Sequence, residues 1–320
     1  MRHHSRPRVL NAWDLPAALP DELGISVVAR YLKDWSYLDS RRLANRELGL
    51  GSRLACPAIS APINLLKYGA ETLRRTIAQS TVWNQTLLPY YLSFRTAQDV
   101  EISLQRLERG QRCFDLLRLV SVDKPRHLRF CVACFAQDVS THGEAYWHRS
   151  HQLPAVADCW EHRCALQDST VPYDGLRWYE LTPPDDQNCA PSNCPATRRL
   201  LTGTLAAFVA TESLRALNRK SRVFGYVPQR SLRRILRQLG YESKADNVAA
   251  TRLVADFQDW AITQKSDLLL FGPEGWWLGL FNATRTRPTH VQALIFRRFL
   301  QGRWSSLVEQ MSFNFPGSEE

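Results

Sequence analysis

The stretch FCVACFAQDVSTHGEAYWHRSHQLPAVADCWEHRCAL, residues 130–166, holds four of the chain's eight cysteines and four of its eight histidines. Cys131 and Cys134 form one pair, and Cys159 and His162 form a second pair after 24 intervening residues. Two such pairs are typical of a tetrahedral structural zinc site. Because four protein ligands leave no open position, this site stabilises a module with little core of its own and performs no chemistry.

A second zinc site is a weaker prediction from the same region. His148 and His151 lie three residues apart, and Cys189 and Cys194 follow in a segment rich in Pro, Asp and Asn. Together they make a candidate His2Cys2 site. The alternative is that the histidines only form hydrogen bonds and that the cysteines are free thiols. Cys164 is a replacement ligand for either site. We therefore expect one zinc ion and consider a second.

Length and charge suggest several small domains and an anionic partner. The chain has 320 residues, with 41 Lys+Arg against 31 Asp+Glu and a net charge of +10. Such a balance favours nucleic acid as a partner, although a merely basic protein is the alternative. The first 20 residues contain no apolar signal-peptide core, and no apolar run is long enough to span a membrane. We expect a cytoplasmic, nucleoid-associated protein.

Basic residues cluster in a predicted helix–loop–helix segment over residues 213–241. Its central 23 residues, 215–237, contain no acidic side chain. The four arginines of the second helix fall on one face, opposite an apolar face, as in a helix that lies against a phosphate backbone. A solvated cationic face is the alternative. The candidate DNA-binding residues here are Arg219, Lys220, Arg222, Arg230, Arg233, Arg234 and Arg237.

A smaller basic cluster lies nearer the N-terminus, in a segment with helical periodicity. It consists of Arg41, Arg42 and Arg46, and it is a second candidate for DNA contact. Helix signals start at Pro20 and at Asp39, because Pro and acidic residues favour a first turn. Apolar spacing predicts further helices. They cover residues 62–80, 97–120, 246–263 and 288–311, and others return from about residue 198.

The order of motifs in the central stretch resembles the signature of the TniQ/TnsD family, the target-selection proteins of heteromeric bacterial transposons. The family's CxxC, acidic residue, GE-x-[YF]-W-x-R segment, LP turn and C-x2-H all have counterparts. LPDELGISVVARY (19–31) and TLLPYYLSF (86–94) are similar to its N-terminal helix and its link. Residues 276–300 resemble a segment of longer TnsD-like members. The matching central residues are Cys131, Cys134, Asp138, Gly143, Glu144, Tyr146, Trp147, Arg149, Leu153, Pro154, Cys159 and His162.

The resemblance and the helical spacing of apolar residues together predict a mainly α, multi-domain fold with a small zinc-ribbon-type module. We expect an N-terminal helix-turn-helix-like domain, a central TniQ zinc module and a C-terminal helical basic domain. The predicted boundaries are 1–19 for a flexible arm, 20–122, 123–197 and 198–312 for the three domains, and 313–320 for a disordered tail.

The resemblance implies a non-enzymatic protein that recognises target double-stranded DNA and recruits the transposon's AAA+ ATPase (TnsC-like). The chain has no GxxxxGK[ST], GxGxxG, HExxH or GxSxG motif, which agrees with this view. One alternative is an adaptor that bridges a CRISPR effector complex to the transposition machinery. A zinc-dependent hydrolase is the alternative from another class. It is disfavoured because the CxxC precedes the HGE segment instead of following it.

Overall fold

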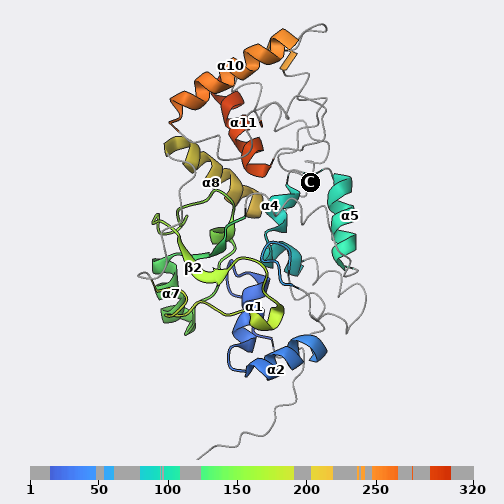
Figure 1. Cartoon of the computed structure of the whole chain (residues 1–320), viewed down its shortest axis with the longest axis vertical. Helices are drawn as coiled ribbons and strands as arrows, with labels where there is room; N and C mark the ends of the chain where they lie inside the picture. Colours follow the sequence, from blue (N-terminus) through green and yellow to red (C-terminus); the bar gives the residue numbers. More distant parts are fainter. Residues whose placement is uncertain are drawn as a thin grey trace, which may run out of the picture.

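A computed structural model shows an elongated arrangement of helices around a small sheet (Figure 1). Helices α10 (Asn247–Thr263) and α11 (His290–Arg303) lie at one end, and α1 (Gly24–Leu32) and α2 (Tyr37–Arg42) lie at the other. The mainly helical composition predicted from the sequence is confirmed. The structure describes residues 15–47, 54–60, 80–93, 95, 97–108, 124–190, 203–218, 236–237, 239–241, 247–265, 276 and 289–303.

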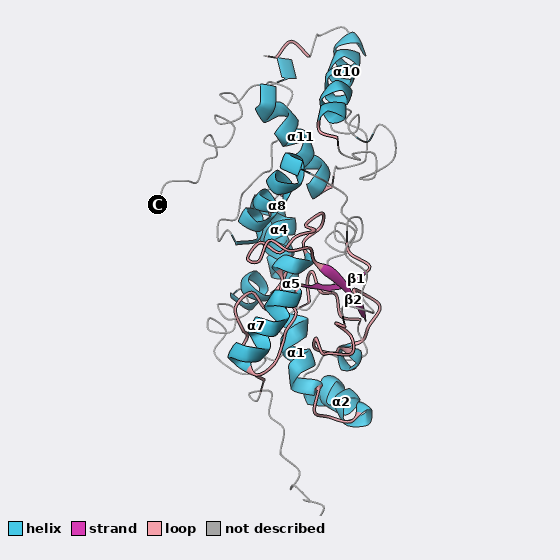
Figure 2. Ribbon diagram, turned by 90° about the vertical axis from the view of Figure 1, so that its left-hand side faces the viewer, coloured by secondary structure: helices cyan, strands magenta, loops and turns pink. Residues whose placement is uncertain are grey.

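The central module contains a two-stranded antiparallel sheet (Figure 2). Strand β1 (His127–Phe130) pairs with β2 (Gln167–Pro172), and Arg129 lies opposite Asp168. Helix α7 (Val132–His142) follows β1 after a single residue. The first predicted ligand pair therefore lies where a strand is followed directly by a helix. The part of the central module that corresponds to the predicted zinc-ribbon-type module is this two-stranded sheet.

Helix α7 has a defined signal at each end. Cys131 is its N-cap in extended conformation, and the Cys131 sulfur accepts a hydrogen bond from the Cys134 N–H. At the other end Gly143 adopts a left-handed conformation with φ 79°, and its N–H donates to the Val139 carbonyl. Glycine suits this position because a Cβ atom is strained there.

Helix α1 begins at Gly24, so the predicted start at Pro20 is wrong by about one turn. Asp21 has a left-handed φ of 56°, which turns the chain before the helix begins. Glu22, expected in the first helical turn, is instead buried and forms an ion pair with Arg30 at 2.8 Å. The acidic residues serve tertiary contacts, which outweigh their preference for a helix start.

Helix α2 begins at Tyr37, two residues before the predicted cap. The Ser36 hydroxyl accepts a hydrogen bond from the Asp39 N–H at 3.3 Å and so caps the helix. A π-helical turn, η2 (Leu43–Glu47), continues the chain.

The link similar to TLLPYY forms a short buried helix. Helix α4 (Leu88–Leu92) has Pro89 in its first turn, where no hydrogen bond is lost. Helix α5 (Ala97–Glu108) follows, within the predicted 97–120. The predicted helix over residues 62–80 lies almost entirely outside the described residues. A small apolar cluster joins the link to α5 through Val82, Leu88, Leu92, Val100 and Leu104.

The C-terminal part has a core of its own, built by α8 (Gly203–Asn218), α10 and α11. The predicted helix over residues 246–263 is confirmed, and α11 falls within the predicted 288–311. Aromatic residues dominate this core, with Phe257 and Phe299 fully buried against each other at 5.2 Å between ring centroids. On α8, the buried Glu212 contacts Arg297 of α11 at 3.2 Å and so joins the two helices.

Helix α11 also contacts α4 through His290. The buried His290 Nε2 donates a hydrogen bond to the Tyr91 carbonyl at 2.8 Å, and its ring lies against Tyr90. Burial lowers the pKa of His290 to about 4, so the imidazole is neutral near pH 7. A neutral donor fits this apolar position, because no charge has to be desolvated.

One hydrophobic core spans the predicted boundary between residues 122 and 123. It contains Leu23, Val28 and Tyr91 from the N-terminal side together with Phe130 and Trp147 from the central module. The N-terminal helices and the central module therefore fold against each other, and the domain boundaries remain a prediction.

Three segments that are distant in sequence meet at the buried Arg149. Its backbone N–H and its guanidinium donate to the Asp21 carbonyl and carboxylate at 2.7 and 3.2 Å. The guanidinium also donates to the carbonyls of Trp83 at 2.8 Å and Thr86 at 3.3 Å. Arg149 thus joins the central module to the turn before α1 and to the link.

Within the described residues, every helix is too short or too polar to cross a membrane.

We expect Arg149→Ala to destabilise the protein by about 3 kcal/mol, because it removes the ion-pair partner of Asp21 and leaves the carbonyls of Trp83 and Thr86 without their donor. Urea unfolding measures the free energy change. The control is Arg126→Ala, which removes an exposed arginine of the same module. Equal stabilities of the two variants would contradict the role of Arg149.

Candidate metal centre

The first ligand pair lies at the junction of β1 and α7. Cys131 directly follows the strand and caps α7, and Cys134 lies in the first turn of that helix. The Cys134 N–H donates to the Cys131 sulfur at 3.4 Å, which holds both side chains on one side of the turn. Burial of both residues keeps the sulfurs away from solvent.

The second ligand pair lies in a tight turn before β2 and repeats the same hydrogen bond. The His162 N–H donates to the Cys159 sulfur at 3.4 Å. The turn is closed by the Cys159 N–H, which donates to the Cys164 carbonyl at 2.8 Å, and by Arg163 in a left-handed conformation with φ 55°. A local hydrogen bond therefore helps to position each ligand pair.

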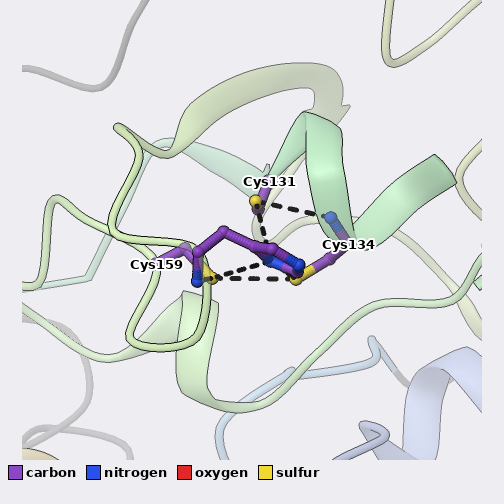
Figure 3. A group of neighbouring side chains, drawn as sticks. Cys131, Cys134 and Cys159 are labelled. Carbon is purple, nitrogen blue, oxygen red and sulfur yellow. Dashed lines mark hydrogen bonds between the residues drawn. The ribbon is translucent and has the colours of Figure 1, made fainter. Parts of the chain in front are cut away.

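The two pairs bring their four ligand atoms together. Cys131, Cys134, Cys159 and His162 each offer one atom, and these atoms lie within 4.8 Å of one another. Figure 3 shows the three cysteine side chains pointing toward a common centre. The Cys134 sulfur lies 3.7 Å from the Cys159 sulfur and 3.2 Å from the His162 Nδ1.

These separations fit a tetrahedral zinc ion. With Zn–S bonds of about 2.3 Å, the edge between two sulfurs of a tetrahedron is about 3.7 Å, and the edge between a sulfur and a nitrogen is slightly shorter. The Nδ1 atom of His162 lies 3.7 Å from the sulfurs of both Cys131 and Cys159. The cluster can therefore hold a metal ion such as zinc with little rearrangement.

The electrostatics of the cluster also favour a cation. Hydrogen bonds from Cys131 and Cys134 lower the pKa of Cys159. Hydrogen bonds with Cys131 and Cys159, together with burial, raise the pKa of Cys134. A divalent cation compensates the charge of three thiolates, so metal binding releases protons and weakens as the pH falls.

Gln137 orients the histidine ligand. Its side-chain oxygen lies 3.1 Å from the His162 Nε2, which leaves Nδ1 directed at the cluster. Such a partner on the second ring nitrogen fixes the tautomer of a ligating histidine. The sequence analysis missed Gln137, although it lies three residues after Cys134 and so on the same side of α7.

The predicted second site has other partners within the described residues. The His148 Nε2 lies 2.9 Å from the Asp138 carboxylate. Burial lowers the pKa of His148, but the hydrogen bond to Asp138 outweighs it and the net shift is upward. Cys189 is buried and contacts the neighbouring Asn188 side chain. Since Cys194 lies outside the described residues, the second site stays a prediction.

Two further metal-capable side chains lie close to the first cluster. The buried His151 has its Nε2 3.7 Å from the Cys134 sulfur, and the Cys164 sulfur lies 3.2 Å from the Cys131 sulfur. His151 therefore lies beside the first site. Cys164 is placed as the sequence suggested, next to a ligand that it could replace.

Few of the predicted DNA-binding residues lie in the described part of the chain. Arg41 and Arg42 are exposed in the last turn of α2, and the Arg46 backbone lies in η2. Arg237 is exposed just before Gly240. The remaining members of the basic helix–loop–helix segment lie outside the described residues. They are Arg219, Lys220, Arg222, Arg230, Arg233 and Arg234.

Comparison with known proteins agrees with this architecture. Residues 15–166, which include all four ligands and the core of the N-terminal helices, match the model of the TniQ family. The transposition protein TnsD of transposon Tn7 from Escherichia coli is 23% identical over 154 residues. The match covers 47% of this chain but only 30% of that protein, so this chain corresponds to less than a third of its relative's length.

We expect Cys131→Ser to lose the bound zinc and to unfold the central module, because structural zinc contributes roughly 10 kcal/mol or more to small modules. Elemental analysis of the purified protein and thermal unfolding measure both effects. The control is Cys56→Ser, a cysteine outside the cluster. A zinc-free Cys131→Ser protein with unchanged thermal unfolding would rule out a structural role of the metal.

We expect Gln137→Ala to retain zinc but to lower its affinity about tenfold, as replacement of second-ring-nitrogen partners does. Competition with a fluorescent zinc chelator measures the affinity. Ser140→Ala on the same exposed part of α7 is the matched control. If both variants bind zinc like the unmodified protein, Gln137 does not orient the ligand.

Proposed function

We propose that this protein is a member of the TniQ family that selects target sites for transposition and has no chemistry of its own, because residues 15–166 match the model of that family. The observation that carries the proposal is the family match over a region whose motif residues build one packed unit. Glu144, Trp147 and Arg149 all hold the N-terminal segment, so the motifs have a physical role in this chain.

The metal centre supports a structural role. Three cysteines and one histidine fill the four positions of a tetrahedral site, so a zinc ion there keeps no open position for a substrate or a water molecule. The zinc-dependent hydrolase alternative needs such a position.

The second part of the proposal is that double-stranded DNA is the target. The net charge of +10 favours an anionic partner. The arginines at 230, 233, 234 and 237 have helical spacing on one face, and the exposed Arg41 and Arg42 offer a second contact. We further propose that the protein recruits the transposon's AAA+ ATPase once the target is bound.

Binding to genomic DNA fragments at two salt concentrations tests the proposal. Selective retention of one fragment at the higher salt concentration is expected of a direct reader of DNA, because non-specific phosphate contacts weaken steeply with salt. Weak binding that disappears with salt would contradict direct reading and favour the adaptor, in which a CRISPR effector complex supplies the target.

We expect the triple variant Arg233→Ala, Arg234→Ala and Arg237→Ala to weaken DNA binding and to flatten its salt dependence. Each lost phosphate contact lowers the slope of log affinity against log salt by about 0.9. A filter-binding titration across salt concentrations measures the slope.

The control for this variant removes the same charge elsewhere. Arg106, Arg126 and Arg252 are exposed on other elements, and their replacement by Ala lowers the net charge by the same three units. Equal slopes for the two triple variants would place the DNA-contacting surface outside the predicted basic helix.

A further inference from the structure

An open groove lies between the turn that joins α1 to α2, helix α7 and the segment 179–186. Its volume is about 1040 Å³. One wall includes Tyr37 and Ser40 of α2, whose last turn carries Arg41 and Arg42, but none of the predicted DNA-binding residues lines the groove. Its apolar surface is formed by Trp35, Tyr37, Phe135, Val139, Leu181 and Pro183.

Two of these apolar side chains are unusually exposed for their size. Tyr37 is 56% exposed although its ring packs against Tyr179 at 5.5 Å, and Val139 is 44% exposed on a helix whose other face is buried. Leu38, next to the groove, is 73% exposed. Clustered exposure of this kind marks an interaction surface more than single exposed residues do.

The charge around the groove is opposite to that of the chain as a whole. Five acidic residues line it, against one basic residue, Lys33. A chain with a net charge of +10 has no general excess of acids that would explain this local pattern. The acidic residues are Asp34, Glu144, Glu180, Asp185 and Asp186.

Three of these acids already have partners in the fold. Glu144 pairs with Arg30 and Lys33, Glu180 accepts from the Arg177 N–H at 2.7 Å, and Asp185 accepts from the Asn188 N–H at 2.7 Å.

The other two acids are directed at solvent. Asp34 and Asp186 are exposed, and neither forms an ion pair with another described residue. Their carboxylates face solvent at the groove, whereas the first three acids partly stabilise the groove's own walls.

We propose that this groove docks a segment of a partner protein in which Lys or Arg side chains flank large apolar residues. The apolar floor fits the large side chains, and the acidic residues complement the basic ones. Nucleic acid does not fit, because the groove repels phosphate. The identity of the partner rests on the proposed function, because the ATPase that the protein is proposed to recruit is the one expected to supply this segment.

Selection from a random twelve-residue peptide library displayed on phage, with the full chain as bait, tests the proposal. We expect the enriched peptides to combine Lys or Arg with aromatic or aliphatic residues. Their affinity should fall about tenfold for the variant Asp34→Lys and Asp186→Lys, because the rim then repels the peptide. Val139→Asp should weaken binding by a similar factor through the apolar floor.

Matched variants control for charge and hydrophobicity alone. Glu101→Lys with Asp259→Lys changes two exposed acids on α5 and α10, and Ile262→Asp changes an exposed aliphatic residue of α10. All three substitutions lie outside the groove and should leave peptide affinity unchanged.

Several results would overturn the proposal. One is enrichment of acidic peptides, and another is peptide binding that the groove variants do not change. A third is binding that appears only after residues 2–13 are deleted, which would make the chain's own basic N-terminal segment the occupant.

DNA binding by the groove variants separates the two proposals. If the groove binds peptides but the unmodified protein retains no DNA, only the DNA-reading function fails.

Discussion

The rest of the structure depends on the convergence of four ligand atoms from two short turns. Cys131 and His162 are 31 residues apart, and their ligand atoms lie 3.7 Å from each other. A metal ion at this point would close the chain between α7 and the turn before β2. The segment 143–153 has little regular structure of its own, so a metal ion and a few buried side chains would fix its path.

That segment is what holds the N-terminal helices. The Leu23 N–H donates to the Trp147 carbonyl at 2.9 Å, and the Trp147 N–H donates to the Ser26 hydroxyl at 3.0 Å. Arg149 extends the contact to the link that contains α4, and His290 joins α4 to α11. A path of buried polar contacts therefore runs from the metal centre to the C-terminal helices. A groove with an acidic rim lies beside it, on a part of the molecule that the predicted basic helix does not include.

The sequence was sufficient for features that depend on local spacing. The ligand set could be predicted because each pair is held by a turn of fixed length, and α10 because its apolar period continues for four turns. Features decided by partners distant in sequence could not be predicted. Asp21 and Glu22 resemble a helix start, but they form ion pairs with Arg149 and Arg30. Helix α1 therefore begins later, at Gly24. The contact between His148 and Asp138 is another such feature, because nothing in the local sequence shows that these two side chains lie side by side. Gln137 was missed because its role depends on the position of His162, which lies 25 residues further along the chain.

Hydrogen exchange of the zinc-loaded protein and of the protein after chelation tests the central role of the metal most directly. We expect chelation to speed amide exchange in residues 131–164 and also in α1, whose attachment depends on the segment 143–153, while α10 retains its protection in a separate core. Loss of protection confined to the ligand turns, with α1 unchanged, would contradict the claim that the metal centre holds the N-terminal helices in place.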